Sequence, residues 1–159
     1  MAVTAHVFPS FSLNALKKTL DVYPGNDALD VLLITSGTYT WGATPETQTH
    51  VSEFLLGDGT NGALGEVLTT GGTNYTRQAL SGVTLGDSGL VTTLDCNNPS
   101  WAAATFSAKY ALFYDSTVGG TDSTNQIMCY WDFGASPGVN NTSFTLTISG
   151  SGLVTWTSS

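Results

Sequence analysis

Charged residues are scarce in this 159-residue chain, and basic ones are the scarcest. Only 10% of the residues are charged, compared with about 25% in an ordinary soluble domain. The formal net charge is −8, and the four basic residues are Lys17, Lys18, Arg77 and Lys109. Phosphate backbones and anionic lipid surfaces are bound by clusters of Lys and Arg. We therefore expect neither nucleic acid nor a membrane surface as a partner.

Long apolar runs are missing, and cysteine is rare. No stretch approaches the roughly 18 apolar residues of a membrane-spanning helix, and the N-terminus MAVTAHVFPSF lacks the pattern of a secretion signal. We expect synthesis in the cytoplasm. Cys96 and Cys129 are too few for a disulfide framework and are expected to be reduced, buried thiols. A disulfide between them is the alternative if the finished protein works outside cells.

Strong helix formers are also underrepresented, whereas Ser, Thr, Asn and Gly are abundant. This composition favours strands and turns. Hydrophobic residues make up 41% of the chain, which is enough for a packed core. With no linker or internal repeat, residues 1–159 are expected to form a single β-rich domain with a short N-terminal arm over about residues 1–9.

Apolar patterning predicts about seven to nine short strands. The run at 28–35 predicts a strand buried on both faces, the aromatic segments at 108–115 and 127–134 predict a long-looped hairpin, and 143–150 alternates like a half-buried strand. Further extended segments are expected at 65–70, 74–80, 82–85, 90–95 and 153–159, and a turn at 135–141. Short helices are expected at 10–20 and 49–56, the second capped by Thr49 with Glu53 in its first turn. The fold class predicted is mainly β, an antiparallel β-sandwich with one or two short helices near the N-terminus.

The tetrapeptide Gly86-Asp87-Ser88-Gly89 matches the sequence around the nucleophile of trypsin-like serine proteases. Such catalysis needs a base beside the serine, and only His6 and His50 are available. The motif continues here as Leu90-Val91 instead of Gly-Pro, and those two-barrel enzymes are considerably longer. We interpret the motif as a tight turn between two strands. The chain is predicted not to be an enzyme.

Metal and phosphate patterns are equally weak. The two histidines and two cysteines lie far apart, without zinc-type spacing. Asp58 and Asn61 do not alternate as the oxygen ligands of a calcium loop do, and the glycines at 57–65 are not followed by the Lys-Ser/Thr of a phosphate loop. No catalytic residue, metal ligand or cofactor-binding residue is therefore assigned. A cation held at the surface by loop carboxylates remains an alternative.

Two further groupings have a functional and a structural interpretation. Asp115 and Asp132 belong to the two aromatic strands and could face one cleft as a sugar-hydrolysing pair, but solvated strand ends are the simpler interpretation. The aromatic residues could form a platform that stacks on sugars, but a core role is favoured because Leu and Ile are few. They are Trp101, Tyr110, Tyr114, Tyr130 and Trp131.

Several segments, in this order, resemble a family of small structural proteins of tailed bacteriophages and prophages. The most telling are TAHVF at the start, NYTRQALSGVTL at 74–85 and YALFYD…YWDFG at 110–134. None is a catalytic signature, and the resemblance extends over nearly the whole chain as an overall pattern.

The resemblance implies a virion component made in the host bacterial cytoplasm. Within the virion, a capsid decoration (cement) protein on the assembled shell is the first expectation. A tail, baseplate or fibre component and a carbohydrate-binding module are the alternatives. The implied partners are the major capsid protein or other virion proteins and further copies of the chain, with a trimer favoured. The aromatic loops and the N-terminal arm are the expected contact segments.

Overall fold

The structure is a computed structural model that describes residues 3–17, 21–22, 27–41, 48–57, 62–68, 72–117 and 120–157. Within these ranges the chain forms eleven strands and two short helices, and all strand pairing is antiparallel. The prediction of a mainly β, antiparallel sandwich with two short helices, one of them near the N-terminus, is confirmed. The strand number exceeds the predicted seven to nine because β1 (Thr4–Val7) and β7 (Ser100–Ser107) were not predicted as strands.

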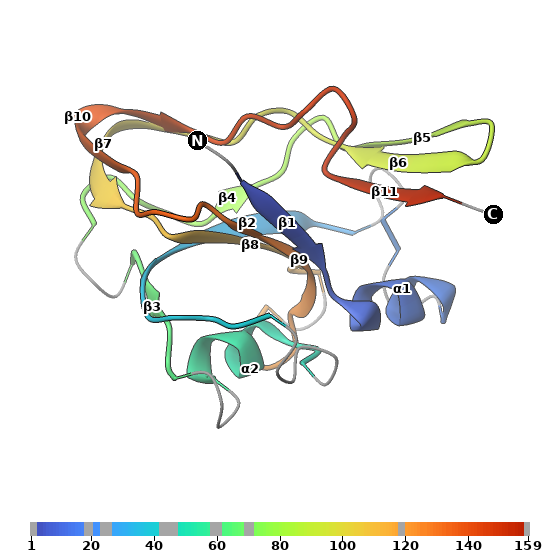
Figure 1. The fold of residues 1–159 in the computed structure, drawn as a ribbon, viewed down its shortest axis with the longest axis horizontal. Helices are drawn as coiled ribbons and strands as arrows, with labels where there is room; N and C mark the ends of the chain where they lie inside the picture. The colour runs from blue at the N-terminus through green and yellow to red at the C-terminus, as the bar shows by residue number, and fades with distance from the viewer. Residues whose placement is uncertain are drawn as a thin grey trace.

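A six-stranded sheet forms the middle layer of the molecule (Figure 1). Its order is β1 (Thr4–Val7), β9 (Gln126–Asp132), β8 (Tyr110–Asp115), β2 (Leu29–Ser36) and β3 (Gly65–Glu66), and β4 (Gln78–Ala79) also pairs with β2. The central strands are nearly continuous apolar runs, as expected when both faces are covered. All six residues of β8 are buried, and the predicted pairing of the two aromatic strands is confirmed by the β8–β9 register.

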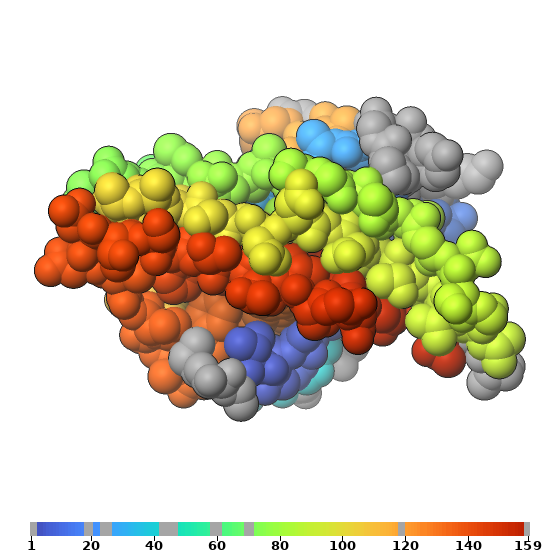
Figure 2. All heavy atoms as spheres, turned by 90° about the horizontal axis from the view of Figure 1, so that it is seen from above, coloured from blue at the N-terminus to red at the C-terminus, as the bar shows by residue number. Residues whose placement is uncertain are grey.

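The two faces of this sheet are covered differently (Figure 1). Over one face lie a two-stranded sheet of β7 (Ser100–Ser107) and β10 (Gly138–Thr145), and a three-stranded sheet of β5 (Thr84–Ser88), β6 (Val91–Asp95) and β11 (Val154–Thr157). Below the other face lies α2 (Val51–Leu56), and α1 (Pro9–Leu16) lies at one end. Seen from above, the β5–β6 hairpin reaches one end of the molecule (Figure 2).

Alternate side chains along the central strands pack into two separate hydrophobic cores. Leu29, Val31 and Leu33 of β2 point into the inter-sheet core, which also receives residues of β6, β7, β9, β10 and β11. Leu32 and Ile34 point into the second core, which we call the α2 core and which includes residues of α2 and the tyrosine side chains of β8 and β9. The period-two pattern of a strand thus divides one apolar run between two interiors.

The N-terminal segment does not form the predicted arm. Thr4–Val7 is β1, paired in register with Asp132–Cys129 at the edge of the central sheet. His6 lies between the rings of Trp41 and Tyr130, with centroid distances of 4.5 and 4.9 Å. Backbone pairing and ring stacking therefore hold this segment to the body of the protein.

Three local predictions need correction. The predicted turn at 135–141 is wrong in part, because β10 begins at Gly138 and pairs with β7 through an irregular register. The buried positions Phe144, Leu146 and Ile148 do alternate as predicted, although β10 ends at Thr145. The residue that precedes α2 is His50 instead of Thr49, and the Glu53 carboxylate accepts hydrogen bonds from both of their backbone N–H groups.

Candidate functional site

The protease-like tetrapeptide lies in the β5–β6 hairpin. Ser88 is the last residue of β5 and pairs with Val91, so the two-residue connection is Gly89-Leu90. Gly89 has a φ of 64° at the first connecting position, as a type II′ hairpin turn requires. The hairpin is confirmed, but Gly86, Asp87 and Ser88 belong to the strand and only Gly89 to the turn.

Neither histidine accompanies this serine. His6 stacks between Trp41 and Tyr130, and the His50 ring contacts Thr49 and Glu53 at the start of α2. In the part of the chain that the structure describes, no hydrogen bond joins Ser88 to His6 or His50. The arrangement therefore lacks the serine–base contact on which nucleophilic catalysis depends.

The two aspartates considered as a carboxylate pair lie at opposite ends of the β8–β9 hairpin. Asp115 is opposite Gln126, whereas Asp132 is opposite Tyr110. Along β8, five residue steps lead from Tyr110, opposite Asp132, to Asp115, which corresponds to about 17 Å. This is longer than the separation of either type of glycosidase pair, so the pairing does not form.

Asp115 is nevertheless unusual. Its side chain is fully buried, one oxygen accepts a hydrogen bond from the Thr117 backbone N–H at 2.8 Å, and Oδ2 has no hydrogen-bond partner among the described residues. Burial raises the pKa of Asp115, the charges of Asp27 and Asp30 raise it further, and the Thr117 hydrogen bonds lower it. The ionised carboxylate is thus a cost to the fold.

Replacing Asp115 with asparagine should stabilise the protein at neutral pH. A carboxyl group with a raised pKa in the folded state stabilises the protein below its unfolded pKa of about 3.9, and this contribution is lost as the pH rises through the folded pKa. In urea unfolding at pH 7, the free energy of unfolding of Asp115→Asn should exceed that of the native chain by about 1–3 kcal/mol, the usual cost of an unsatisfied buried group. The difference should shrink towards about pH 4.

The control for this prediction is Asp87→Asn, which removes the same charge from an exposed position on β5. It should change stability by less than about 0.5 kcal/mol. An Asp115→Asn advantage that is absent at pH 7, or equally large at both pH values, would contradict the assigned cost of the buried carboxylate.

The five aromatic residues considered as a sugar-stacking platform are all buried. Tyr110, Tyr114, Tyr130 and Trp101 are at most 2% exposed, and Trp131 is 8% exposed. They lie in the two cores, and the indole N–H of Trp101 donates to the Thr76 carbonyl at 2.7 Å. The core interpretation of these residues is confirmed, and the aromatic row does not offer a surface platform.

The structure describes only some of the residues that could bind a cation in a loop. Asp58 and Asn61 fall outside the described residues. Among the His, Cys, Asp and Glu side chains that are described, no group of three or more is placed to hold a metal ion.

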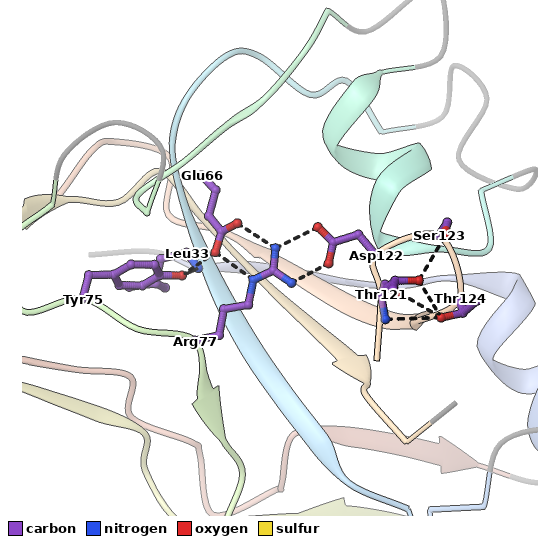
Figure 3. Close-up of polar contacts among 8 residues, drawn as sticks. All are labelled: Leu33, Glu66, Tyr75, Arg77, Thr121, Asp122, Ser123 and Thr124. Carbon is purple, nitrogen blue, oxygen red and sulfur yellow. Dashed lines mark hydrogen bonds and ion pairs between the residues drawn. The ribbon is translucent and has the colours of Figure 1, made fainter. Parts of the chain in front are cut away.

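Sequence reasoning missed the most elaborate polar cluster, which centres on Arg77 (Figure 3). Its guanidinium donates to both oxygens of Glu66, at 2.9 and 2.7 Å, and to both oxygens of Asp122. The Tyr75 hydroxyl donates to Glu66 at 3.3 Å and accepts from the Leu33 backbone N–H at 2.7 Å. Three distant parts of the chain therefore meet at one side chain.

Burial gives this Arg77 cluster its importance for stability. Glu66 is only 4% exposed, and the Arg77 guanidinium forms ion pairs with both Glu66 and Asp122. These hydrogen bonds to Asp122 and Glu66 raise the pKa of Arg77, and the guanidinium also lies 5.7 Å from the centre of the Tyr114 ring. The signal in the sequence was the position of a lone arginine in a strongly acidic chain, which requires acidic partners. Its partners could not be identified from spacing.

The two cysteines are free and buried, as predicted. Both belong to the inter-sheet core. Burial raises the pKa of the Cys96 thiol to about 11, with a further contribution from Asp95, and burial also raises the pKa of Cys129. Thiolate, the reactive form, is therefore suppressed at both positions.

Both thiols should resist labelling while the protein is folded. At pH 8, a disulfide reagent such as dithionitrobenzoate should react with the native protein at least about a hundredfold more slowly than with the protein in concentrated guanidinium chloride, because the thiols are buried and protonated. Two equivalents should react after unfolding. Rapid labelling of one thiol in the native protein would show that one of them is accessible.

Three surface depressions stand out among the described residues. Two share Val3 and Trp131, at the edge where β1 faces the segment after β10, and the buried Trp131 N–H has no acceptor in the described part of the chain. The third, which we call the α1 groove, has a volume of about 340 Å³ between α1 and the three-stranded sheet. Ser12, Ala15 and Leu16 line one side, Leu85, Thr92 and Trp156 the other, and Val22 completes the lining.

Comparison with known proteins gives no relative for this chain. No family model, no curated protein and no solved structure matches it. Neither helix in the described part is long and apolar enough to cross a lipid bilayer.

Proposed function

We propose that this chain is a structural protein of a tailed-phage virion, and that it acts there as a capsid decoration protein that binds the assembled shell. The observation that carries the proposal is the ordered occurrence of TAHVF, NYTRQALSGVTL and YALFYD…YWDFG, which resemble small virion proteins.

The positions of these segments in the fold support the proposal. TAHVF supplies β1, the segment at 74–85 supplies Tyr75 and Arg77 of the Arg77 cluster together with β4, and the segment at 110–134 supplies β8 and β9. The segments that carry the resemblance thus supply strands of the central sheet and part of the Arg77 cluster. A likeness confined to surface loops would say less about the molecule as a whole.

The side chains that could be reactive have structural positions in this fold, which is also in keeping with a binding role. The thiols are buried, Arg77 is held by two carboxylates, His6 is stacked between two rings, and Ser88 ends a hairpin strand. A protein of this kind would act through shape and buried contact area. The buried aromatic residues weigh against the alternative of a carbohydrate-binding module.

The proposal is tested on particles of the phage or induced prophage whose genome encodes the chain. After density-gradient purification, quantitative mass spectrometry should find the chain at a copy number comparable to that of the major capsid protein. Electron cryo-microscopy should then place it on the outer surface of the head. A low copy number with density on the tail would reject the decoration role, and absence from purified particles would reject the virion assignment altogether.

A further inference from the structure

The α1 groove exists because the three-stranded sheet extends past the inter-sheet core. In the antiparallel register, Leu85, Leu94 and Val154 form one row across the sheet, and Asp87, Thr92 and Trp156 form the next row on the same face. Leu94 and Val154 are buried in the inter-sheet core. The second row lies at the border of that core, against which Trp156 still packs, on the part of the sheet that continues above α1 (Figure 1).

Helix α1 covers this overhanging face only in part. Phe11 packs on Trp156 with a centroid distance of 5.3 Å, and the Trp156 indole N–H reaches the Ser12 hydroxyl at 3.5 Å. Leu16, at the end of the helix, is 84% exposed, and Leu85 on the opposite side of the groove is 39% exposed. Apolar surface is therefore left in water on both sides of the groove.

The two elements that border the groove, α1 and the β5–β6 hairpin, carry many of the exposed apolar side chains, and Leu16 and Leu85 line the groove itself. Of the eight large hydrophobic residues that are exposed in the described part of the chain, four lie on α1 and the β5–β6 hairpin: Leu13, Leu16, Leu85 and Leu90. Leu13 precedes Leu16 by one helical turn and lies on the same side of the helix. Clustered exposure of this kind is typical of a contact surface.

The basic residues of the described part differ in how far they are engaged within the molecule. Three of the four basic residues are described, and two are engaged internally: Arg77 by Glu66 and Asp122, and Lys109 by the Gly37 carbonyl and the Thr38 hydroxyl. The exposed Lys17 follows Leu16, and its ammonium has no hydrogen-bond or ion-pair partner among the described residues. On the opposite side of the groove, Asp87 projects from the same strand face as Leu85.

We propose that the α1 groove is the contact surface between two copies of this chain. A net charge of −8 makes copies repel one another over most of their surface. This surface carries a cation and an anion on either side of an apolar centre. A twofold arrangement places Lys17 of each copy opposite Asp87 of the other and brings the two apolar rims together. Such self-complementarity is what a symmetric dimer requires.

The inference is independent of the proposed function, because self-association is measured on the purified protein without particles. Sedimentation equilibrium from micromolar to submillimolar concentration should show a reversible monomer–dimer equilibrium. Leu16→Asp buries an unpaired charge in the interface and should weaken association about a hundredfold or more. The matched control is Leu56→Asp, since Leu56 is also the last residue of a helix and is 75% exposed. It should leave association unchanged.

A charge exchange tests the pairing across the twofold axis. Lys17→Glu and Asp87→Lys should each weaken the dimer by about threefold to thirtyfold, because two rim pairs are lost. The double variant should restore most of the affinity. Circular dichroism and thermal unfolding confirm that each variant is folded. A protein that stays monomeric, a trimer, equal effects of Leu16→Asp and Leu56→Asp, or no rescue in the double variant would each overturn the inference.

Discussion

Replacing Arg77 with methionine should lower the free energy of unfolding by about 3–5 kcal/mol, the usual result of removing one partner from a buried ion pair. The Glu66 side chain, at 4% exposure, would lose the two guanidinium hydrogen bonds that now offset its desolvation. Asp122, which is 35% exposed, can turn to water and should contribute less of the loss. Urea denaturation at pH 7 measures the change.

Two companion variants separate charge from packing at this cluster. Arg77→Lys keeps the charge but loses the planar fork that contacts two carboxylates at once, so its loss should be intermediate. Adding Glu66→Leu to Arg77→Met removes the stranded carboxylate and should recover part of the stability, because replacing both partners of a buried pair is often close to neutral. If Arg77→Met alone cost less than about 1 kcal/mol, the cluster would rank with ordinary surface ion pairs.

Truncating Tyr130 to alanine should cost about 3–5 kcal/mol, as for other large aromatic residues in cores. The side chain is 1% exposed and stands at the centre of the α2 core. Its ring packs against six others, those of His6, Phe8, Tyr39, Trp41, Phe54 and Tyr110. The substitution would remove the ring that packs against side chains of β1, β8 and α2 at once. Thermal unfolding should therefore show a lower midpoint.

Tyr130→Phe is the matched control for this truncation. It keeps the ring and its packing and removes only the hydroxyl, so stability should stay within about 1 kcal/mol of the native chain. A phenylalanine variant as unstable as the alanine variant would mean that the hydroxyl, and not the ring, carries the effect. A mild effect of alanine would mean that the α2 core collapses around the missing ring.

The central strands of the main sheet could be predicted from the sequence because they are long apolar runs with strong periodic signals. The strand at 28–35 and the aromatic hairpin of β8 and β9 lie where the pattern predicts, and both faces of β8 are apolar because two cores share it. The short helix at 10–20 was also predicted, although it ends at Leu16. Residue patterning suffices where burial alone decides the structure.

Elements at sheet edges were harder to predict because pairing partners, and not local preference, define them. β1 has only four residues and a polar pattern, so it is recognised as a strand by its register with β9. β10 begins in a segment of Gly, Val and Asn that is typical of a turn, and it becomes a strand through β7. The Arg77 cluster and the α1 groove likewise depend on contacts between distant segments. No spacing rule in one sequence reveals such contacts.

The two cores lie on opposite faces of the same three strands, β2, β8 and β9. A disturbance that reaches β8 therefore affects both cores at once, because side chains of β8 belong to each of them. The molecule should open as one cooperative unit, with the backbone amides of β8 the last to exchange their hydrogens with the solvent.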